Sequence, residues 1–186
     1  MRTAYIGMGG NLASWAGGPE ATLAAAALRL KALGRVTRRS SLYSTEPVGY
    51  AAQPRFVNAV VELETELTPR ALLEGLLAIE LAFGRDRTAG IANGPRTLDL
   101  DILFLDDLRI REPDLEVPHP RLAERAFVLV PLSEIAPQMM DARTGKSVSQ
   151  LLNVLHIQAG EAADGVVPIQ SDVWPADAGA GVPGGA

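Results

Sequence analysis

Gly94-Pro-Arg-Thr-Leu-Asp-Leu-Asp-Ile102 is the most strongly patterned stretch of this sequence, and Leu103 and Phe104 extend it. Leucine and isoleucine alternate with Asp99 and Asp101, which is the period of a β-strand that buries one face. A strand points successive side chains to opposite sides, so the two aspartates share a face. The stretch therefore predicts a half-buried strand that carries two carboxylates side by side.

The residues before this strand predict an alternating order of elements. Apolar and β-branched runs favour strands over residues 3–8, 36–43 and 56–63. Helical patterns lie between them, from Gly18-Pro19 to Gly34 and from Thr68-Pro69 to Gly84, with Pro near each start and Gly at each end. The order is β-α-β-β-α-β, so we predict an α+β protein with a ferredoxin-like core, an antiparallel sheet and helices packed on it.

Extra elements follow this core. Residues 107–118 predict a loop or short hairpin, and residues 125–136 and 147–155 predict helices. Residues 156–186 are rich in Ala, Gly and Pro and lack a helical or strand period. We therefore predict one domain over residues 1–155, followed by a flexible extension. Hydrophobic side chains of the extension can still pack along the domain surface, namely Val166, Val167, Ile169, Val173 and Trp174.

Composition excludes several classes of protein. There is no cysteine, so disulfides and thiolate metal sites are excluded. We expect a cytoplasmic protein without a membrane span, because there is no signal peptide and no run of about 20 apolar residues. The net charge is −5, and the extension holds four acids without Lys or Arg, which leaves −1 for the rest. A nearly neutral domain without a basic stripe argues against nucleic acid as a partner.

Three arginines flank a glycine-containing loop just before the strand of Asp99 and Asp101. They are Arg85, Arg87 and Arg96, and the planar guanidinium fork matches phosphate oxygens. Paired carboxylates suit Mg²⁺, which completes its octahedron with substrate phosphates and water. Two aspartates alone also fit a solvated acidic face, but with the arginines they indicate a site for phosphoryl or pyrophosphoryl transfer.

Six separated blocks resemble the 6-hydroxymethyl-7,8-dihydropterin pyrophosphokinase family, which transfers pyrophosphate from ATP to a pterin alcohol in folate biosynthesis. The resemblance runs from about residue 3 to about residue 153, in the family's order and spacing, which makes residues 1–155 the expected catalytic domain. The blocks are Tyr5–Leu12, Ser41–Gly49, Gln53–Val60, Ile79–Arg87, Gly94–Ile102 and Val117–Phe127.

The resemblance implies an ATP side of the site. Asp99 and Asp101 are expected to hold two Mg²⁺ ions that bridge the ATP phosphates. Arg85 and Arg96 are expected to contact the phosphates and stabilise charge in the transition state. Glu80 and Arg87 are expected to contact the nucleotide. The alternatives are an ordinary helix-surface carboxylate for Glu80 and a solvated loop charge for Arg87. The nucleotide-contacting positions implied in this way are Glu80, Arg87, Arg96, Ile102, His119 and Arg125.

It also implies a pterin side. A flat bicycle needs aromatic faces, which Phe56 and Phe127 supply, and its amide-like edge needs paired donors and acceptors, which Asn58 supplies. Each aromatic ring fits an ordinary core position as well. The positions that match the family's pterin contacts are Gly9, Thr45, Val48, Phe56, Asn58 and Phe127.

The chain departs from some relatives in the loop from Arg85 to Arg96, here named the arginine loop. Ile91 and Ala92 stand where those relatives have Arg and Trp, which predicts fewer phosphate contacts and weaker ATP binding. The metal pair and Arg85 and Arg96 are intact. No residue in the blocks is an obvious general base for the pterin hydroxyl.

Two other functions compete with the pyrophosphokinase. One is a catalytically silent ferredoxin-like module that binds a pterin or a nucleotide, and the intact Asp99 and Asp101 argue against it. The other is a different metal-dependent phosphotransferase or nucleotide hydrolase, which would not need Thr45, Phe56 and Asn58. We therefore expect a monomeric enzyme whose partners are two small molecules, ATP and 6-hydroxymethyl-7,8-dihydropterin.

Overall fold

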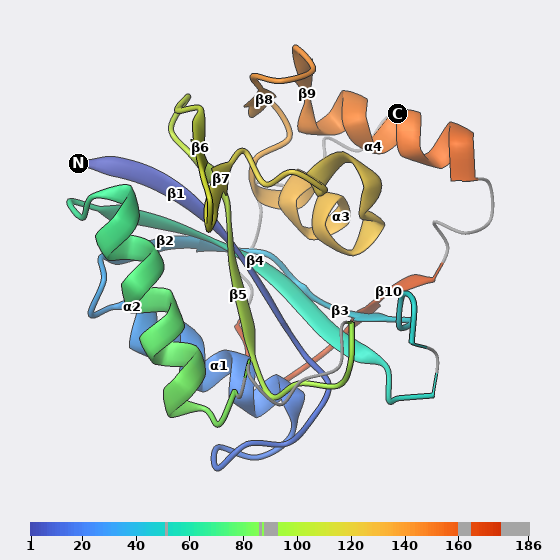
Figure 1. The fold of residues 1–186 in the computed structure, drawn as a ribbon. Coiled ribbons are helices and arrows are strands. Elements are labelled where there is room, and N and C mark those ends of the chain that lie inside the picture. The colour runs from blue at the N-terminus through green and yellow to red at the C-terminus, as the bar shows by residue number, and fades with distance from the viewer. Residues whose placement is uncertain (51, 86, 88–92, 160–164, 176–186) are drawn as a thin grey trace, which may run out of the picture.

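The computed structural model describes residues 1–50, 52–85, 87, 93–159 and 165–175. Its centre is an antiparallel six-stranded sheet with helices on both faces (Figure 1). The strands run in the order β10-β3-β4-β1-β5, and β2 pairs with β4 beside this path. Their bounds are β1 (Arg2–Gly10), β2 (Arg35–Arg39), β3 (Leu42–Thr45), β4 (Phe56–Thr65), β5 (Asp99–Leu105) and β10 (Val166–Ile169).

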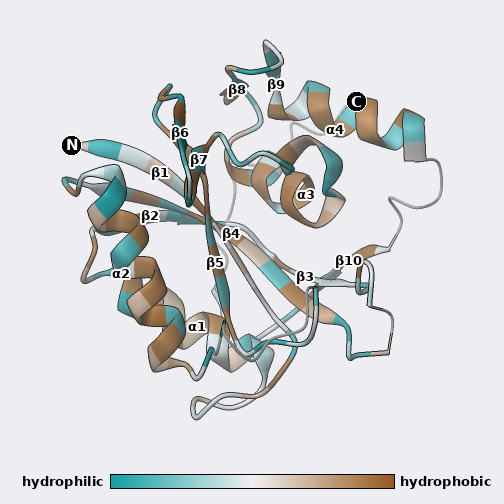
Figure 2. Ribbon diagram, in the orientation of Figure 1, coloured by the Kyte–Doolittle hydropathy of each residue, from teal (hydrophilic) through white to brown (hydrophobic). Residues whose placement is uncertain are grey.

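Two helices, α1 (Pro19–Leu30) and α2 (Pro69–Ala82), cover one face of the sheet (Figure 1). Thr68 starts α2, because its side-chain oxygen accepts a hydrogen bond from the Ala71 amide. Figure 2 shows brown, hydrophobic residues on α1 and α2 and in the strands between the two helical layers. The α+β class and the alternating element order are confirmed.

The predicted strand over residues 36–43 was wrong in one respect, because it is two strands. Ser40 lies between β2 and β3, and its hydroxyl oxygen accepts a hydrogen bond from the Val60 amide at 2.9 Å. A side chain thus takes the place that a backbone carbonyl has in a regular ladder. The Ser40 carbonyl is left free of the ladder for another donor.

The opposite face of the sheet packs against α3 and α4. A second hydrophobic cluster joins Val60 and Leu103 to Leu129 and Leu132 of α3. The 3₁₀ turn and the β8–β9 hairpin complete this side. The β6–β7 hairpin instead packs with the first face, where Leu115 and Val117 join the core under α1 and α2 and Asp114 pairs with Arg70 of α2. The bounds are β6 (Ile110–Glu112), β7 (Leu115–Val117), η1 (Leu122–Glu124), α3 (Ala126–Ile135), β8 (Met140–Asp141), β9 (Lys146–Ser147) and α4 (Val148–Ala159).

Part of the predicted extension lies against the domain. Strand β10 pairs with β3, so that Val166 lies opposite Thr45, and Trp174 is only 4% exposed. This differs from the expected flexible segment and follows the alternative in which its hydrophobic side chains pack on the surface. Residues 160–164 and 176–186 lie outside the described residues. None of the described helices has the length and hydrophobicity that crossing a membrane requires.

Candidate active site

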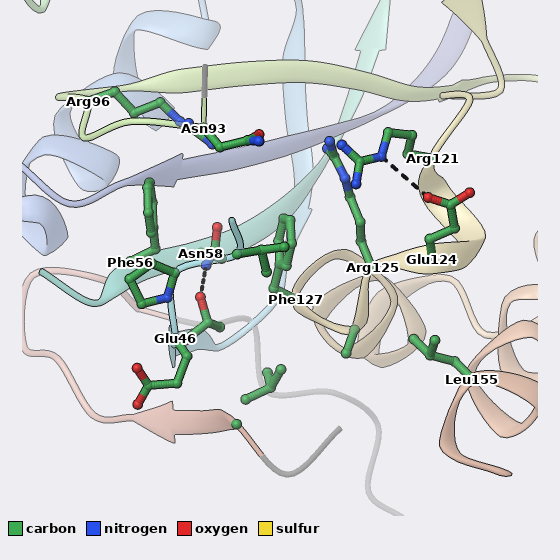
Figure 3. Close-up of a pocket in the computed structure, with 16 residues that line it drawn as sticks. Glu46, Phe56, Asn58, Asn93, Arg96, Arg121, Glu124, Arg125, Phe127 and Leu155 are labelled. Carbon is green, nitrogen blue, oxygen red and sulfur yellow. Dashed lines mark hydrogen bonds and ion pairs between the residues drawn. The ribbon is translucent and has the colours of Figure 1, made fainter. Parts of the chain in front are cut away.

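A cavity of about 280 Å³ opens where β3, β4 and the start of α3 meet (Figure 3). Five of the six residues predicted for the pterin side line it, and the sixth, Gly9, lines a smaller cleft beside it. Figure 3 shows the rings of Phe56 and Phe127 in this cavity, with Asn58 between them in the view. The five lining residues are Thr45, Val48, Phe56, Asn58 and Phe127.

The polar edge of the cavity is built by Asn58 and Thr45. The Asn58 Nδ2 donates to Thr45 Oγ1 at 2.7 Å, and both residues are buried. This bond fixes the orientation of the amide, which has further donor and acceptor capacity for a ligand. Val48 is 59% exposed and lies at the rim.

Each aromatic ring of the cavity is paired with an arginine. The Arg96 guanidinium carbon lies 4.8 Å from the Phe56 ring centroid, and that of Arg125 lies 5.6 Å from the Phe127 centroid. Both distances are in the cation–π range. Both arginines line this cavity and also the smaller cleft beside it.

The smaller cleft contains both aspartates of β5, together with Gly9, Arg96 and Arg125. Burial, followed by the charge of Asp99, raises the pKa of Asp101 to about 6. Each carboxylate thus lies in the other's field, which a bound cation would offset. Within the described ranges no set of three or more His, Asp and Glu residues forms a metal site. A Mg²⁺ ion here would need phosphate oxygens and water to complete its shell, which is its usual habit.

Three arginines converge on Asp99. Arg96 Nε lies 3.1 Å from Asp99 Oδ2, and the Nη2 atoms of Arg85 and Arg87 each lie 3.6 Å from Asp99 Oδ1. The Nε atoms of Arg85 and Arg96 are buried and have no hydrogen-bond partner among the described residues. Three guanidiniums beside two carboxylates fit an anionic, metal-bound ligand such as a polyphosphate.

Glu80 is buried, not a helix-surface carboxylate, being 1% exposed. Its carboxylate accepts two hydrogen bonds from Arg87, at 2.8 and 2.7 Å, and one from the Leu100 amide at 2.7 Å. Burial raises its pKa. Glu80 lines neither cavity. Through these hydrogen bonds it joins α2 to Arg87 and to β5.

His119 is held by its backbone beside the site. Its amide donates to the Leu103 carbonyl at 3.0 Å, and its carbonyl accepts from Arg143 Nη2 at 2.9 Å. Its Nδ1 accepts from the Arg121 amide at 3.1 Å. Burial, followed by the nearby charge of Arg125, lowers the pKa of His119 to about 4, so its imidazole is neutral at pH 7.

Ile102 is the one predicted nucleotide position whose side chain lies in the hydrophobic core. It is buried with the residues that face α1 and α2 and lines neither cavity. Ile91 and Ala92, where weaker phosphate contact was predicted, lie outside the described residues.

Asn11 is a site residue that the sequence analysis did not single out. Its Oδ1 accepts from the Arg96 amide at 2.8 Å, and its Nδ2 donates to Gln53 Oε1 and the Pro54 carbonyl at 3.0 and 2.9 Å. It thus ties the arginine loop to the loop before β4. The signal available in the sequence was a polar asparagine directly after Gly9-Gly10, at the end of a predicted strand. The remaining cavity-lining residues are Glu46, Pro47, Asn93, Arg121, Glu124, Ala126, Leu155, Gly165 and Val166.

Comparisons with known proteins identify the family of this chain. The family model for 7,8-dihydro-6-hydroxymethylpterin-pyrophosphokinase matches residues 5–137. A 2-amino-4-hydroxy-6-hydroxymethyldihydropteridine pyrophosphokinase of Synechocystis sp. is 43% identical over 149 residues, which cover 80% of this chain and 74% of that protein. The Bacillus subtilis protein of the same name is 44% identical over 149 residues, which cover 79% of this chain and 86% of the relative.

A solved structure has a similar fold. The Plasmodium falciparum HPPK-DHPS triple mutant aligns with a TM-score of 0.68 at 16% identity over 89% of this chain, which spans 46% of that longer chain. At this identity the likeness shows the fold alone, whereas the family model and the two relatives show the family. The chain belongs to the 7,8-dihydro-6-hydroxymethylpterin pyrophosphokinase family.

Proposed function

We propose that the cavity of Phe56 and Phe127 and the smaller cleft of Asp99 and Asp101 are two halves of one active site. In it, pyrophosphate passes from ATP to the hydroxymethyl oxygen of 6-hydroxymethyl-7,8-dihydropterin, which gives AMP and the pterin pyrophosphate. The activity is that of the family. The observation that carries it to this chain is the sheet register, in which Gly9 lies opposite both Asn58 of β4 and Asp99 of β5.

The pterin is placed by the cavity. Its ring stacks on Phe56 and Phe127, and its amide-like edge meets Asn58 and Thr45. Because the cavity adjoins the cleft of Asp99, a pterin bound this way directs its hydroxymethyl group toward the carboxylates. In phosphoryl transfer the protein itself does little covalent chemistry. Orientation of the two reactants therefore supplies a large share of the rate enhancement.

The phosphates are placed by the cleft. Asp99 and Asp101 would hold two Mg²⁺ ions, whose charge offsets the repulsion between the nucleophile and the ATP phosphates. Arg85 and Arg96 lie beside Asp99, where their guanidiniums would contact phosphate oxygens, and Arg125 lines both cavities. His119, neutral at pH 7, would act as a hydrogen-bonding group and not as a cation. Glu80 would hold the cleft in shape, because it accepts hydrogen bonds from Arg87 and from the Leu100 amide, which lies between Asp99 and Asp101 on β5.

Release of AMP from ATP and Mg²⁺, with and without the pterin, tests this proposal. Pterin-dependent AMP supports it, and ADP would indicate single-phosphoryl transfer or hydrolysis instead. The catalytically silent binding module predicts that both ligands bind in calorimetry while neither AMP nor ADP forms. A cytoplasmic location and a monomeric state stay predictions from the sequence.

A further inference from the structure

The wall of the aromatic cavity includes residues from the end of the chain. Gly165 and Val166 line it beside Thr45 and Glu46. They lie beyond residue 137, where the match to the family model ends. The cavity that we assign to the pterin is therefore completed by a segment that the family model does not cover.

Strand β10 supports the strand that carries Thr45. β3 is only four residues long, and β10 pairs with all four, from Val166 opposite Thr45 to Ile169 opposite Leu42. Without β10, β3 would be a short edge strand, and short edge strands with few neighbours open readily. Thr45 is also the partner of Asn58, so opening of β3 would release both polar groups of the cavity.

Arg55 joins the same segment to the rim. Its Nε donates to Ser44 Oγ at 2.8 Å, and its Nη2 donates to the carbonyls of Ser44 and Gly165 at 3.2 and 3.1 Å. It also forms an ion pair with Glu46. One guanidinium thus connects the end of β3, the rim residue Glu46 and the start of the C-terminal segment.

Trp174 anchors the far end of this segment. Its indole Nε1 donates to the Ser40 carbonyl at 2.8 Å, the carbonyl that the break between β2 and β3 leaves free. The Arg39 guanidinium carbon lies 5.5 Å from the ring centroid. A tryptophan that is buried and hydrogen-bonded in this way holds its segment to the sheet. Detachment would expose the hydrophobic ring to water and break the hydrogen bond of its indole N–H.

We propose that Gly165–Ile169 together with Trp174, here named the C-terminal clamp, is a positioning element of the pterin pocket. It keeps Thr45, Asn58 and the rim in the geometry that binds the pterin, and it does not take part in ATP binding. The proposal rests on the proposed function, because it assumes that the cavity takes the pterin. The clamp should affect the pterin and not ATP because of the strand order. Strand β10 lies at the opposite edge of the sheet from β5, which carries the two aspartates.

The test compares three chains: full length, residues 1–175 and residues 1–164. Pterin binding is measured by fluorescence titration, and binding of Mg²⁺ with a non-hydrolysable ATP analogue by calorimetry. We expect residues 1–164 to bind the pterin about tenfold more weakly and the ATP analogue within about twofold of full length. Residues 1–175 keep the clamp and should match full length for both ligands.

A point variant keeps the test decisive if the shortened chain does not fold. Trp174→Ala should weaken pterin binding and speed hydrogen exchange of the β3 amides, whereas Val173→Ala, at a neighbouring side chain that is 52% exposed, should change neither. Unchanged pterin affinity in Trp174→Ala, or an equal loss for the pterin and the ATP analogue, overturns the clamp. A full-length chain that binds ATP but no pterin would instead contradict the proposed function.

Discussion

Asn58 and Asp99 lie at the same level of the sheet, on either side of Gly9. Strand β1 runs between β4 and β5, and Gly9 is the partner of Asn58 in one ladder and of Asp99 in the other. The group assigned to the pterin edge and a carboxylate assigned to the metal are thus held on two rigid strands that are separated by β1 alone. The distance between the two halves of the site is set by strand spacing and not by a loop.

Gly9→Ala tests this relationship. A Cβ at position 9 would lie 2.7 Å from Asn58 Oδ1, so the amide must turn away from its present orientation. We expect the KM for the pterin to rise about tenfold while the KM for ATP stays within about twofold. Steady-state kinetics check this, with Gly18→Ala as the control, because a Cβ at Gly18 meets no atom within 4 Å. An unchanged pterin KM would show that the amide orientation does not matter for binding.

Asp99→Asn and Asp101→Asn should lower kcat by at least about a thousandfold, because a neutral amide oxygen binds Mg²⁺ more weakly than a carboxylate does. Both side chains face a cleft and not the core, so thermal unfolding should stay close to that of the parent chain. AMP release and a thermal melt are the two measurements. A large fall in the melting temperature would assign these residues a structural role instead.

Glu80→Ala should destabilise the fold, since it leaves the buried Leu100 amide without its acceptor and Arg87 without its partner. A cost of roughly 2–3 kcal/mol is expected for removal of a buried charged acceptor. Denaturant unfolding measures it. Glu74→Ala, on an exposed face of the same helix, is the matched control and should stay within about 0.5 kcal/mol. Equal effects of the two variants would contradict the supporting role of Glu80.

His119 predicts a pH dependence of stability. Its pKa falls from 6.5 in the unfolded chain to about 4 in the fold, so the unfolded state binds more protons between these values. The contribution of His119 is therefore present above about pH 6.5 and is lost as the pH falls toward 4. In His119→Asn the melting temperature should fall less between pH 7 and pH 5 than in the parent chain. His156→Asn, at an exposed position of α4, serves as control, and parallel curves for all three proteins would contradict the assignment.

The element order and the pair of aspartates were predictable from local sequence. A period of two, a Thr-Pro helix start and a terminal Gly each act over a few residues, and the structure confirms a strand at Asp99–Leu105 and a helix that begins after Thr68. The convergence of three arginines on Asp99 was predictable only in part. The chain shows that they lie near one another in sequence but not which oxygen each approaches.

Glu80, Asn11 and Trp174 illustrate what local sequence could not predict. Helical spacing places Glu80 on the buried face of α2 with Leu72 and Leu76, but its two partners, an amide from β5 and the Arg87 guanidinium, come from other segments. Asn11 gains its role from Arg96, 85 residues away, and Trp174 from Ser40, 134 residues away.

The amino-acid sequence by itself determined the family, the α+β order of elements, and the residue types that handle phosphate and pterin. Periodicity, helix caps and motif spacing are local properties that a chain carries before it folds. Only the tertiary structure decided that Gly9 lies between Asn58 and Asp99, that residues 36–43 divide at Ser40, and that β10 completes the pocket. The physical reason is that hydrogen bonds between distant segments form only when the sheet assembles, and each buried donor then takes whichever acceptor the assembled fold presents.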